Sequence, residues 1–472
     1  MNALETEAKI AQKFKANKNA FGQVNLKKIV IEYGPLFCIL VGFLLTSLSV
    51  GPYNNGDTIK EYDAVSGILN KGLPIITGGY LMDEPPVGFY IQAFFFKFFG
   101  ASFDNGLLII LLFGLGCITL VYAIGKAAYN KTTGFFAALL FAFTPWHLIL
   151  SRSFLIDVPC LFFSLLSLFV GLLAFRRQSI RLLIISGIVF AVAFSTKLYA
   201  VFILIPLLTL FLKSKTHTFK EALTWVVAFS IPVVVSTLLW YQTITGVGLS
   251  AIYAHTDLTI LNPAVVAPTP FFATNFLISY GIGWLFLDAA ALSALVSLWQ
   301  RRRFRKYLTI DVIFLATIFC ILLVNTLLGA VLDLKAPFLN AIKYDYQALP
   351  FFSLLAASLI SKSLSLYNMS KTKEKVAKVS LAAVALLGIA LVASALFYNM
   401  SYIHLFSTWD YLIFRVAPNV NEGYSLFNPN PIGVNSLAMG LQFLGFTSAT
   451  LGILWVSKDK LKLTLKRIRA AI

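Results

Sequence analysis

The sequence GPYNNGDTIKEYDAVSGILNKGLPIITGGYLMDEPP, residues 51–86, is the first long polar stretch of the chain. One apolar segment precedes it, and a long series of apolar segments follows it. The stretch contains five of the twenty acidic residues of a basic chain, namely Asp57, Glu61, Asp63, Asp83 and Glu84. A polar, acidic segment enclosed by apolar ones predicts a loop that carries chemistry between membrane spans.

The composition is that of a membrane protein. The 472 residues are 58% hydrophobic and 12% charged, with a mean hydropathy of +0.82. Soluble domains are about a quarter charged, so this chain has roughly half their charge. Its apolar runs are about 20 residues long, which suits a helix crossing a bilayer core of about 30 Å. We therefore predict an all-α integral membrane protein whose residues 1–472 form a single polytopic domain.

Twelve apolar stretches are predicted to span the membrane. They are residues 29–50, 104–127, 132–150, 153–175, 180–196, 198–212, 220–241, 273–299, 309–332, 340–361, 379–398 and 434–456. A thirteenth stretch, 85–103, is short, aromatic and contains Lys97. It could be either a span or a helix that lies along the membrane interface.

The distribution of basic residues decides between these alternatives. If 85–103 lies along the interface, 30 of the 38 Lys and Arg residues fall on one side, in the two termini and five short loops. Cytoplasmic loops carry such an excess, and the bias would collapse if 85–103 crossed the bilayer. We therefore predict twelve spans (thirteen if 85–103 crosses), a plasma-membrane location and cytoplasmic termini, including the basic tail 457–472. Topology also accounts for the net charge of +18, so no nucleic-acid partner is expected.

This topology places three loops outside the cytoplasm: the catalytic loop 51–103, with juxtamembrane helices that include the interfacial one, and the loops 242–272 and 399–433. The unusual ionisable residues and tyrosines then gather on that same outer face, at Asp57, Asp83, Glu84, Arg152, Asp157, Lys197, His255, Lys343, Tyr344 and Tyr346. Ionisable groups near a membrane are costly, and they are functional candidates by default.

Two kinds of chemistry suit these residue types. Lys197, Lys343 and Tyr346 could hold a phosphate and stabilise it as a leaving group. A carboxylate could accept the proton of an attacking hydroxyl group. Asp83 or Glu84 with His255 could also hold a divalent metal beside the phosphate. A phosphate at a membrane surface implies a lipid phosphate.

The order of these motifs is similar to that of a known superfamily. An Asp in the first loop is followed by an acid before Pro85 and Pro86, then by SRSFLIDVP (151–159), FSTKLYA (194–200), YAHTDL (253–258) and AIKYDYQALP (341–350). This order resembles the polyprenyl-phosphate-sugar glycosyltransferases of the GT-C fold. The nearest groups are the lipid A aminoarabinose transferases and the protein O-mannosyltransferase-like proteins. The resemblance extends to about residue 360 and is strongest over 51–200.

The resemblance implies a role for each matched position. Asp57 and Asp157 correspond to catalytic acids of the family. Donor-phosphate contacts are expected at Lys197 and Tyr346, with Lys343 and Arg152 as further cations. Asp83 and His255 fall where the metal ligands of the family lie, and Glu84, beside Asp83, would add a third ligand for Mg, Mn, Ca or Zn.

The chain departs from the family pattern at two positions. Thr58 stands where the family commonly has Glu, and Glu84 stands where the aminoarabinose transferases have Lys before Pro. The second change removes a phosphate-binding cation. Lys197, Lys343 or Arg152 would have to supply that charge instead.

The sequence therefore predicts an inverting membrane glycosyltransferase. Its donor would be a polyprenyl or dolichyl monophosphate sugar among the membrane lipids. The acceptor hydroxyl would belong to a protein, a lipid or a glycan on the extracytoplasmic side. The sugar transferred is left open.

Other interpretations compete with this one. Asp288, near the middle of 273–299, would suit a secondary transporter or lipid-glycan flippase, although it could also bond to Asn325 within the bundle. Asp157 could simply cap a helix, and Lys197 could extend to the headgroups. Arg152 could form a structural ion pair with Asp157.

Overall fold

The structure is a computed structural model. It describes residues 26–49, 56–213, 218–247, 309–327, 344–369 and, apart from 442 and 446, 440–456. Several predictions concern positions outside these residues: His255, Asp288, Lys343, the spans 273–299 and 379–398, the loop 399–433, most of 242–272 and the tail 457–472. In the described part of the chain, the regular elements are helices, and an isolated bridge joins Ile75 to Leu81.

Four of the described helices are long and apolar enough to cross a membrane: α2 (Leu26–Ser49), α5 (Phe103–Ala128), α8 (Asp157–Arg177) and α11 (Phe219–Val247). Shorter apolar helices occupy other predicted spans, namely α6 (Lys131–Ala142), α9 (Ile180–Phe194), η1 (Leu198–Ile203), α10 (Leu204–Lys213), α14 (Ile310–Leu327), η5 (Tyr346–Ala348), α16 (Leu349–Met369) and a helix at Phe443–Val456. The predicted all-α membrane fold is confirmed, and the number of spans stays a prediction.

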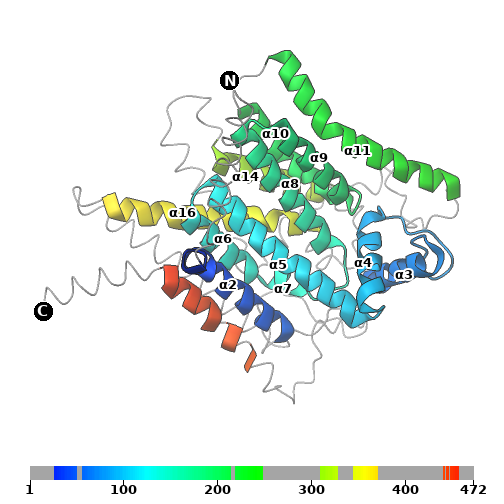
Figure 1. Ribbon diagram of the computed structural model, residues 1–472, viewed down its shortest axis with the longest axis horizontal. Helices are drawn as coiled ribbons and strands as arrows, with labels where there is room; N and C mark the ends of the chain where they lie inside the picture. Colours follow the sequence, from blue (N-terminus) through cyan, green and yellow to red (C-terminus); the bar gives the residue numbers. More distant parts are fainter. Residues whose placement is uncertain are drawn as a thin grey trace, which may run out of the picture.

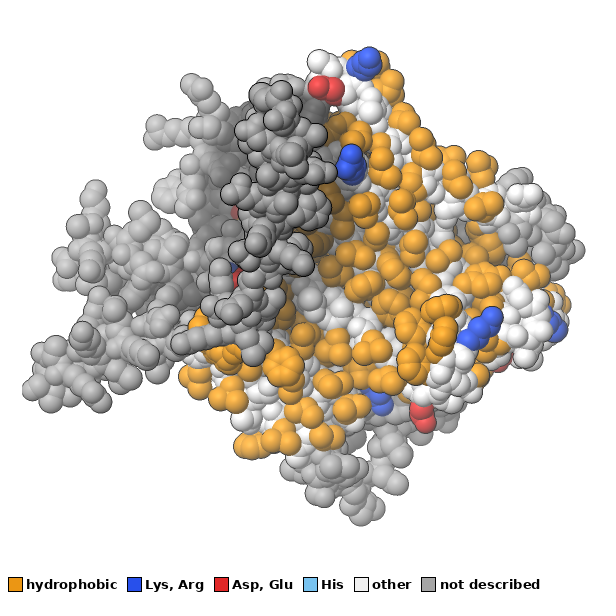
Figure 2. Space-filling view, viewed as in Figure 1, with side chains coloured by type: hydrophobic (Ala, Val, Ile, Leu, Met, Phe, Trp, Pro, Cys, Tyr) orange, Lys and Arg blue, Asp and Glu red, His pale blue; other side chains and the backbone are white. Residues whose placement is uncertain are grey.

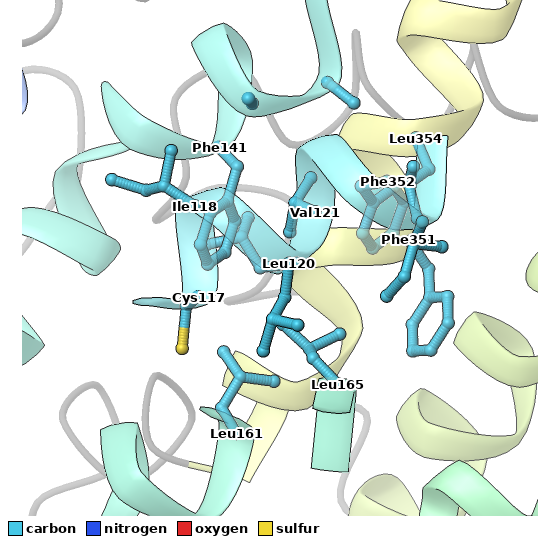
Figure 3. Packing of buried hydrophobic residues seen from close by; sticks show 14 of the residues in the cluster. Cys117, Ile118, Leu120, Val121, Phe141, Leu161, Leu165, Phe351, Phe352 and Leu354 are labelled. Atoms are coloured by element: carbon cyan, nitrogen blue, oxygen red, sulfur yellow. The ribbon is translucent and has the colours of Figure 1, made fainter. Parts of the chain in front are cut away.

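The bundle core lies where α5, α6, α8 and α16 pack together. Figure 3 shows Ile118 and Val121 of α5 beside Phe141 of α6, Leu165 of α8 and neighbouring side chains of α16. A Cβ atom on Gly125 of α5 would come within 2.7 Å of the Gly134 Cα of α6. The absence of a side chain at Gly125 lets these two backbones approach closely, as is common between membrane helices.

The outer surface of the bundle is apolar. In the most apolar part of α11, within Phe219–Trp240, only 6% of the residues are buried inside the structure. Leu238 and Leu239 are each 60% exposed. Figure 2 shows a broad hydrophobic face with few charged side chains on it. Such a surface suits lipid rather than water.

The polar stretch 51–86 contains a helix whose bounds the sequence analysis did not give. This helix, α3 (Gly56–Lys71), packs against α4 (Val87–Phe99) at one edge of the molecule (Figure 1). Ala64 and Val65 of α3 and Phe89 and Ala93 of α4 share a small apolar cluster. With 13 residues, α4 is roughly 20 Å long, which is short for a crossing of about 30 Å.

Two of the predicted spans that fall in the described part of the chain are interrupted. The segment 132–150 forms α6 and a separate short helix, α7 (Pro145–Leu150). Proline at 145 has no backbone N–H to continue the α6 hydrogen bonds, and the Thr144 hydroxyl donates to the Leu140 carbonyl at 2.7 Å. The segment 153–175 becomes helical only from Asp157. Ile156, in the turn directly before Asp157, contacts α3 through its backbone N–H.

Candidate active site

Three helix ends meet beside α3: the start of α4, the start of α8 and the end of α9. The Val87 N–H at the start of α4 donates to the Ser195 carbonyl at 2.9 Å, just after α9. A Cβ atom on Gly88 would lie 2.7 Å from Thr196 Cγ2 and 3.0 Å from Ile156 Cγ2. Because glycine has no side chain, α4 can pack directly on the turn that contains Lys197.

Lys197 joins two of the predicted site residues. Its Nζ lies 3.0 Å from Asp157 Oδ2 and 3.3 Å from Glu84 Oε1. Lys197 is 5% exposed and Asp157 is 2% exposed. The Lys197 ammonium also lies 5.9 Å from the centre of the Tyr199 ring. A charge this deeply buried needs such partners, because desolvation of an unpaired charge costs several kcal/mol.

Glu61, on α3, is a further buried acid beside Lys197 and Asp157. It is 2% exposed, and its Oε2 accepts a 2.7 Å hydrogen bond from the backbone N–H of Ile156, directly before Asp157. Glu61 also interacts electrostatically with Glu84, Lys197, Asp157 and Asp57. We call the five residues Asp57, Glu61, Glu84, Asp157 and Lys197 the ionic cluster.

The ionic cluster raises the pKa values of both Glu61 and Lys197. Burial raises the pKa of Glu61 well above its usual value, and Glu84, Asp157 and Asp57 raise it further against the opposing effect of Lys197. Burial alone would lower the pKa of Lys197. The three carboxyl groups of Asp157, Glu84 and Glu61 outweigh this effect and raise that pKa well above the ordinary lysine value.

Asp57 lies one helical turn before Glu61 in the first turn of α3, and it is partly exposed. Residues four apart lie on the same face of a helix, so Asp57 and Glu61 share one face of α3. This i, i+4 spacing was the available signal for Glu61. It went unused in the sequence analysis because juxtamembrane helices were expected in the first loop without residue bounds.

Arg152 and Asp157 are not partners in the structure. Asp157 pairs with Lys197 instead, and Arg152 interacts with Asp104. The Nε atom of Arg152 is buried and has no hydrogen-bond partner among the described residues. Arg152 lies in a turn that precedes α8, shortly before Asp157, and is not one of the five residues of the ionic cluster.

Tyr346 is fully buried on the bundle side. Its hydroxyl lies 2.6 Å from His147 Nδ1, and His147 Nε2 lies 3.2 Å from the Gly114 carbonyl oxygen. The aromatic residue beside Lys197 of the ionic cluster is Tyr199, and the ring centre of Tyr344 lies 4.9 Å from that of Tyr199. A phosphate contact at Tyr346 stays a prediction.

The metal site is also still a prediction. No group of three or more His, Cys, Asp and Glu side chains in the described part of the chain is placed to hold a metal ion. Glu84 pairs with Lys197. His255 lies outside the described residues, so its distance from Asp83 is not part of the site geometry.

The middle part of the sequence matches a known protein family. Residues 83–241 match the family described as "Dolichyl-phosphate-mannose-protein mannosyltransferase". The matched segment is about a third of the chain and includes Glu84, Asp157 and Lys197. Asp57 and Glu61 lie before it.

Two curated relatives come from Bacillus subtilis (strain 168). "Putative mannosyltransferase YkcB" is 26% identical over 213 residues, which are 43% of this chain and 30% of that protein. "Putative mannosyltransferase YycA" is 29% identical over 135 residues, which are 29% of this chain and 20% of that protein. Each alignment therefore spans less than a third of the relative.

Solved structures resemble the fold over most of the chain. The archaeal oligosaccharyltransferase AglB from Archaeoglobus fulgidus has a TM-score of 0.51 at 14% identity, over 79% of this chain and 56% of that one. ArnT from Cupriavidus metallidurans in the apo state has a TM-score of 0.52 at 12% identity, over 88% of this chain and 77% of that one. At such low identity these likenesses concern the fold. The chain is a helical integral membrane protein with the GT-C fold.

Proposed function

We propose that this protein is a glycosyltransferase that moves a sugar from a polyprenyl or dolichyl monophosphate to an acceptor hydroxyl. The observation that carries the proposal is the ionic cluster. It joins the predicted catalytic acids Asp57 and Asp157 at one end of a GT-C bundle, within and beside the segment that matches a mannosyltransferase family.

A lipid phosphate donor has independent support. The solved relatives include AglB in complex with a dolichol-phosphate and ArnT bound to undecaprenyl phosphate. The apolar surface of this bundle suits the long tail of such a lipid (Figure 2). The acceptor would be a protein, a lipid or a glycan.

Asp57 is the proposed base. Its partial exposure lets an acceptor hydroxyl approach from water, and its carboxylate takes the hydroxyl proton as the acceptor oxygen attacks the anomeric carbon. The bond between that carbon and the phosphate oxygen breaks, and the lipid phosphate leaves with the bonding electrons. Attack opposite the leaving group inverts the anomeric centre.

Lys197 and Arg152 have different roles in this proposal: Lys197 holds carboxylates, and Arg152 binds the donor phosphate. Lys197 lies between Asp157 and Glu84, so it fixes these carboxylates and reduces their net charge near the donor phosphate. Arg152 has a buried Nε atom without a hydrogen-bond partner in the described residues, and a guanidinium group suits a phosphate. Lys343 would add a second phosphate-binding cation. A divalent ion at Asp83, Glu84 and His255 would supply further positive charge at the phosphate.

The extracytoplasmic side is proposed from the basic residues. The ionic cluster lies at the start of α8 and the end of α9, and Arg176, Arg177 and Arg181 lie at the opposite ends of these helices. The 21 residues of α8 separate the two ends by roughly 30 Å. If the basic end faces the cytoplasm, the ionic cluster faces outward.

The test is donor consumption by the full chain in lipid nanodiscs. Radiolabelled polyprenyl- and dolichyl-phosphate sugars, including mannose, are supplied with and without candidate acceptors. We expect one donor to be consumed. Asp57→Asn should then reduce its turnover by about 10²- to 10⁴-fold, which is the usual contribution of a general base.

Asp63→Asn is the matched control. Asp63 lies on the same helix as Asp57, but its carboxylate accepts a hydrogen bond from the Thr77 hydroxyl and it is not part of the ionic cluster. This control should keep most of the activity. Loss of activity in both variants would indicate a general effect on α3. Failure to bind or consume any donor would contradict the proposed function and turn attention to transport centred on Asp288.

A further inference from the structure

We propose that Glu61 is a positioning residue, which sets the place of Asp57 by binding α3 to the backbone at the start of α8. This inference deepens the proposed function and rests on it. The sequence resemblance assigns no role to Glu61, and the family match begins at residue 83.

The geometry supports a positioning role. The carboxyl group of Glu61 accepts the Ile156 N–H at 2.7 Å, and Ile156 occupies the N-cap position of α8, which has no side-chain cap. The next residue, Asp157, is held by Lys197. One hydrogen bond therefore connects the helix that carries the proposed base to the position of the second catalytic acid.

Burial makes this contact specific. Glu61 and the neighbouring Thr58 are almost fully buried, whereas Asp57 is partly exposed. The side of α3 that holds Glu61 is thus fixed in the protein, and Asp57 lies at the edge of the same face. A buried backbone N–H left without its acceptor costs roughly 1–3 kcal/mol, so loss of the Glu61 carboxyl would favour a shift of α3 or of the segment before α8.

Two substitutions separate the hydrogen bond from the charge. Glutamine keeps a carbonyl oxygen that can accept from Ile156, so Glu61→Gln should retain turnover within about 3-fold of the native chain. Glu61→Ala removes the acceptor and should lower kcat by about 10- to 100-fold, with the donor KM nearly unchanged, because a small misplacement of a catalytic group is that costly. Lys71→Ala, at an exposed position of α3, should change neither value.

A double-mutant cycle distinguishes positioning of the base from a general structural role. If Glu61 acts through Asp57, Glu61→Ala should add little to the loss already caused by Asp57→Asn. If the two losses multiply, Glu61 does not act through Asp57. Equal loss of turnover in Glu61→Gln and Glu61→Ala would also overturn the inference, because it would show that the acceptor oxygen is insufficient.

Hydrogen exchange measures the contact without any activity. Peptides that contain Ile156, from the full chain in nanodiscs, should exchange at least about 10-fold faster in Glu61→Ala than in the native chain and in Glu61→Gln. Unchanged exchange in Glu61→Ala would overturn the inference. If the native chain consumes no donor, the proposed function fails, and the exchange result still decides whether Glu61 fixes α3 to α8.

Discussion

Two buried aspartates show how this molecule uses polar groups in two different ways. Asp345, in the bundle, is fully buried and accepts a 2.7 Å hydrogen bond from the neutral Asn325 amide. Asp157, in the ionic cluster, is almost equally buried, but its partner is the ammonium group of Lys197, which also binds Glu84. The bundle pairs its acid with a neutral group, whereas the cluster concentrates charge.

Other polar groups in the bundle follow the first pattern. The Ser167 hydroxyl donates to the Ser186 carbonyl at 2.9 Å and so connects α8 to α9, and His147 bonds to Tyr346. Each of these contacts satisfies its groups locally and holds two elements together. Only the ionic cluster, among the described residues, brings three carboxyl groups to one buried lysine. Such a costly arrangement is typical of a functional site.

The largest effect should come from Lys197→Met. The substitution keeps much of the side-chain volume but leaves Asp157 and Glu84 without their shared cation. Removing one partner of a buried ion pair costs about 3–5 kcal/mol, so the free energy of unfolding should fall by about that amount and turnover should be lost. Denaturant titration in mixed micelles measures the first value. A loss below about 1 kcal/mol would mean that the cluster behaves like a surface ion pair.

The second effect should come from Gly88→Val, which tests the packing of α4 on the cluster. The new side chain would collide with Thr196 and Ile156. Overpacking of this kind costs about 1–3 kcal/mol, and displacement of Glu84 from Lys197 should also reduce turnover. Thermal unfolding measures the loss of stability, and donor consumption measures the loss of turnover. Both losses should be smaller in Gly88→Ala. Native values for Gly88→Val would show that α4 does not position Glu84.

Asp345→Asn should have a smaller effect still. The new amide keeps an oxygen that can accept from Asn325, so we expect a change in stability below about 1.5 kcal/mol and native turnover. The measurement is the same unfolding titration, run beside Asp157→Asn. If Asp345→Asn abolishes turnover while Asp157→Asn does not, the assignment of the two aspartates is reversed.

The smallest effect should be a change in pH dependence. Because the pKa of Glu61 is raised in the folded chain, the folded state holds this proton more tightly than the unfolded state. This contribution is greatest below the unfolded pKa of about 4.3, and it declines as pH rises toward the folded value. Lys197 stays charged throughout this range.

Glu61→Gln has no proton to lose at this position. The melting temperature of the native chain should therefore fall, relative to that of Glu61→Gln, as the pH is raised from about 5 to about 8. The comparison requires melting curves of both chains at each pH. Parallel curves would show that Glu61 titrates normally in the fold.

Much of the fold could be predicted because apolar runs of bilayer length have few alternatives to helices. The interruptions of the predicted spans and the helix in the first loop were harder to predict. Pro145 divides 132–150, and the helix α3 has too little apolar content to be visible in a search for spans. Asp57, Asp157 and Lys197 could be selected from their rarity, their predicted side and their motif order.

The partners of these residues could not be predicted in the same way. The pairing of Lys197 with Asp157 spans 40 positions, and the bond from Ile156 to Glu61 spans 95. Both depend on how helix ends meet, which no local pattern encodes. The burial of Tyr346 likewise depends on His147, which lies 199 positions away and which the sequence analysis did not include in the site.

The most direct test of the account is the place where the donor phosphate binds. A polyprenyl phosphate with a diazirine beside the phosphate can be crosslinked to the full chain in nanodiscs and mapped by mass spectrometry. The account predicts label at the ionic cluster, on residues 56–61, 152–157 or 195–199, and competition by unlabelled lipid phosphate. Label confined to 126–131 or 176–181, at the opposite ends of α5, α8 and α9, would contradict it.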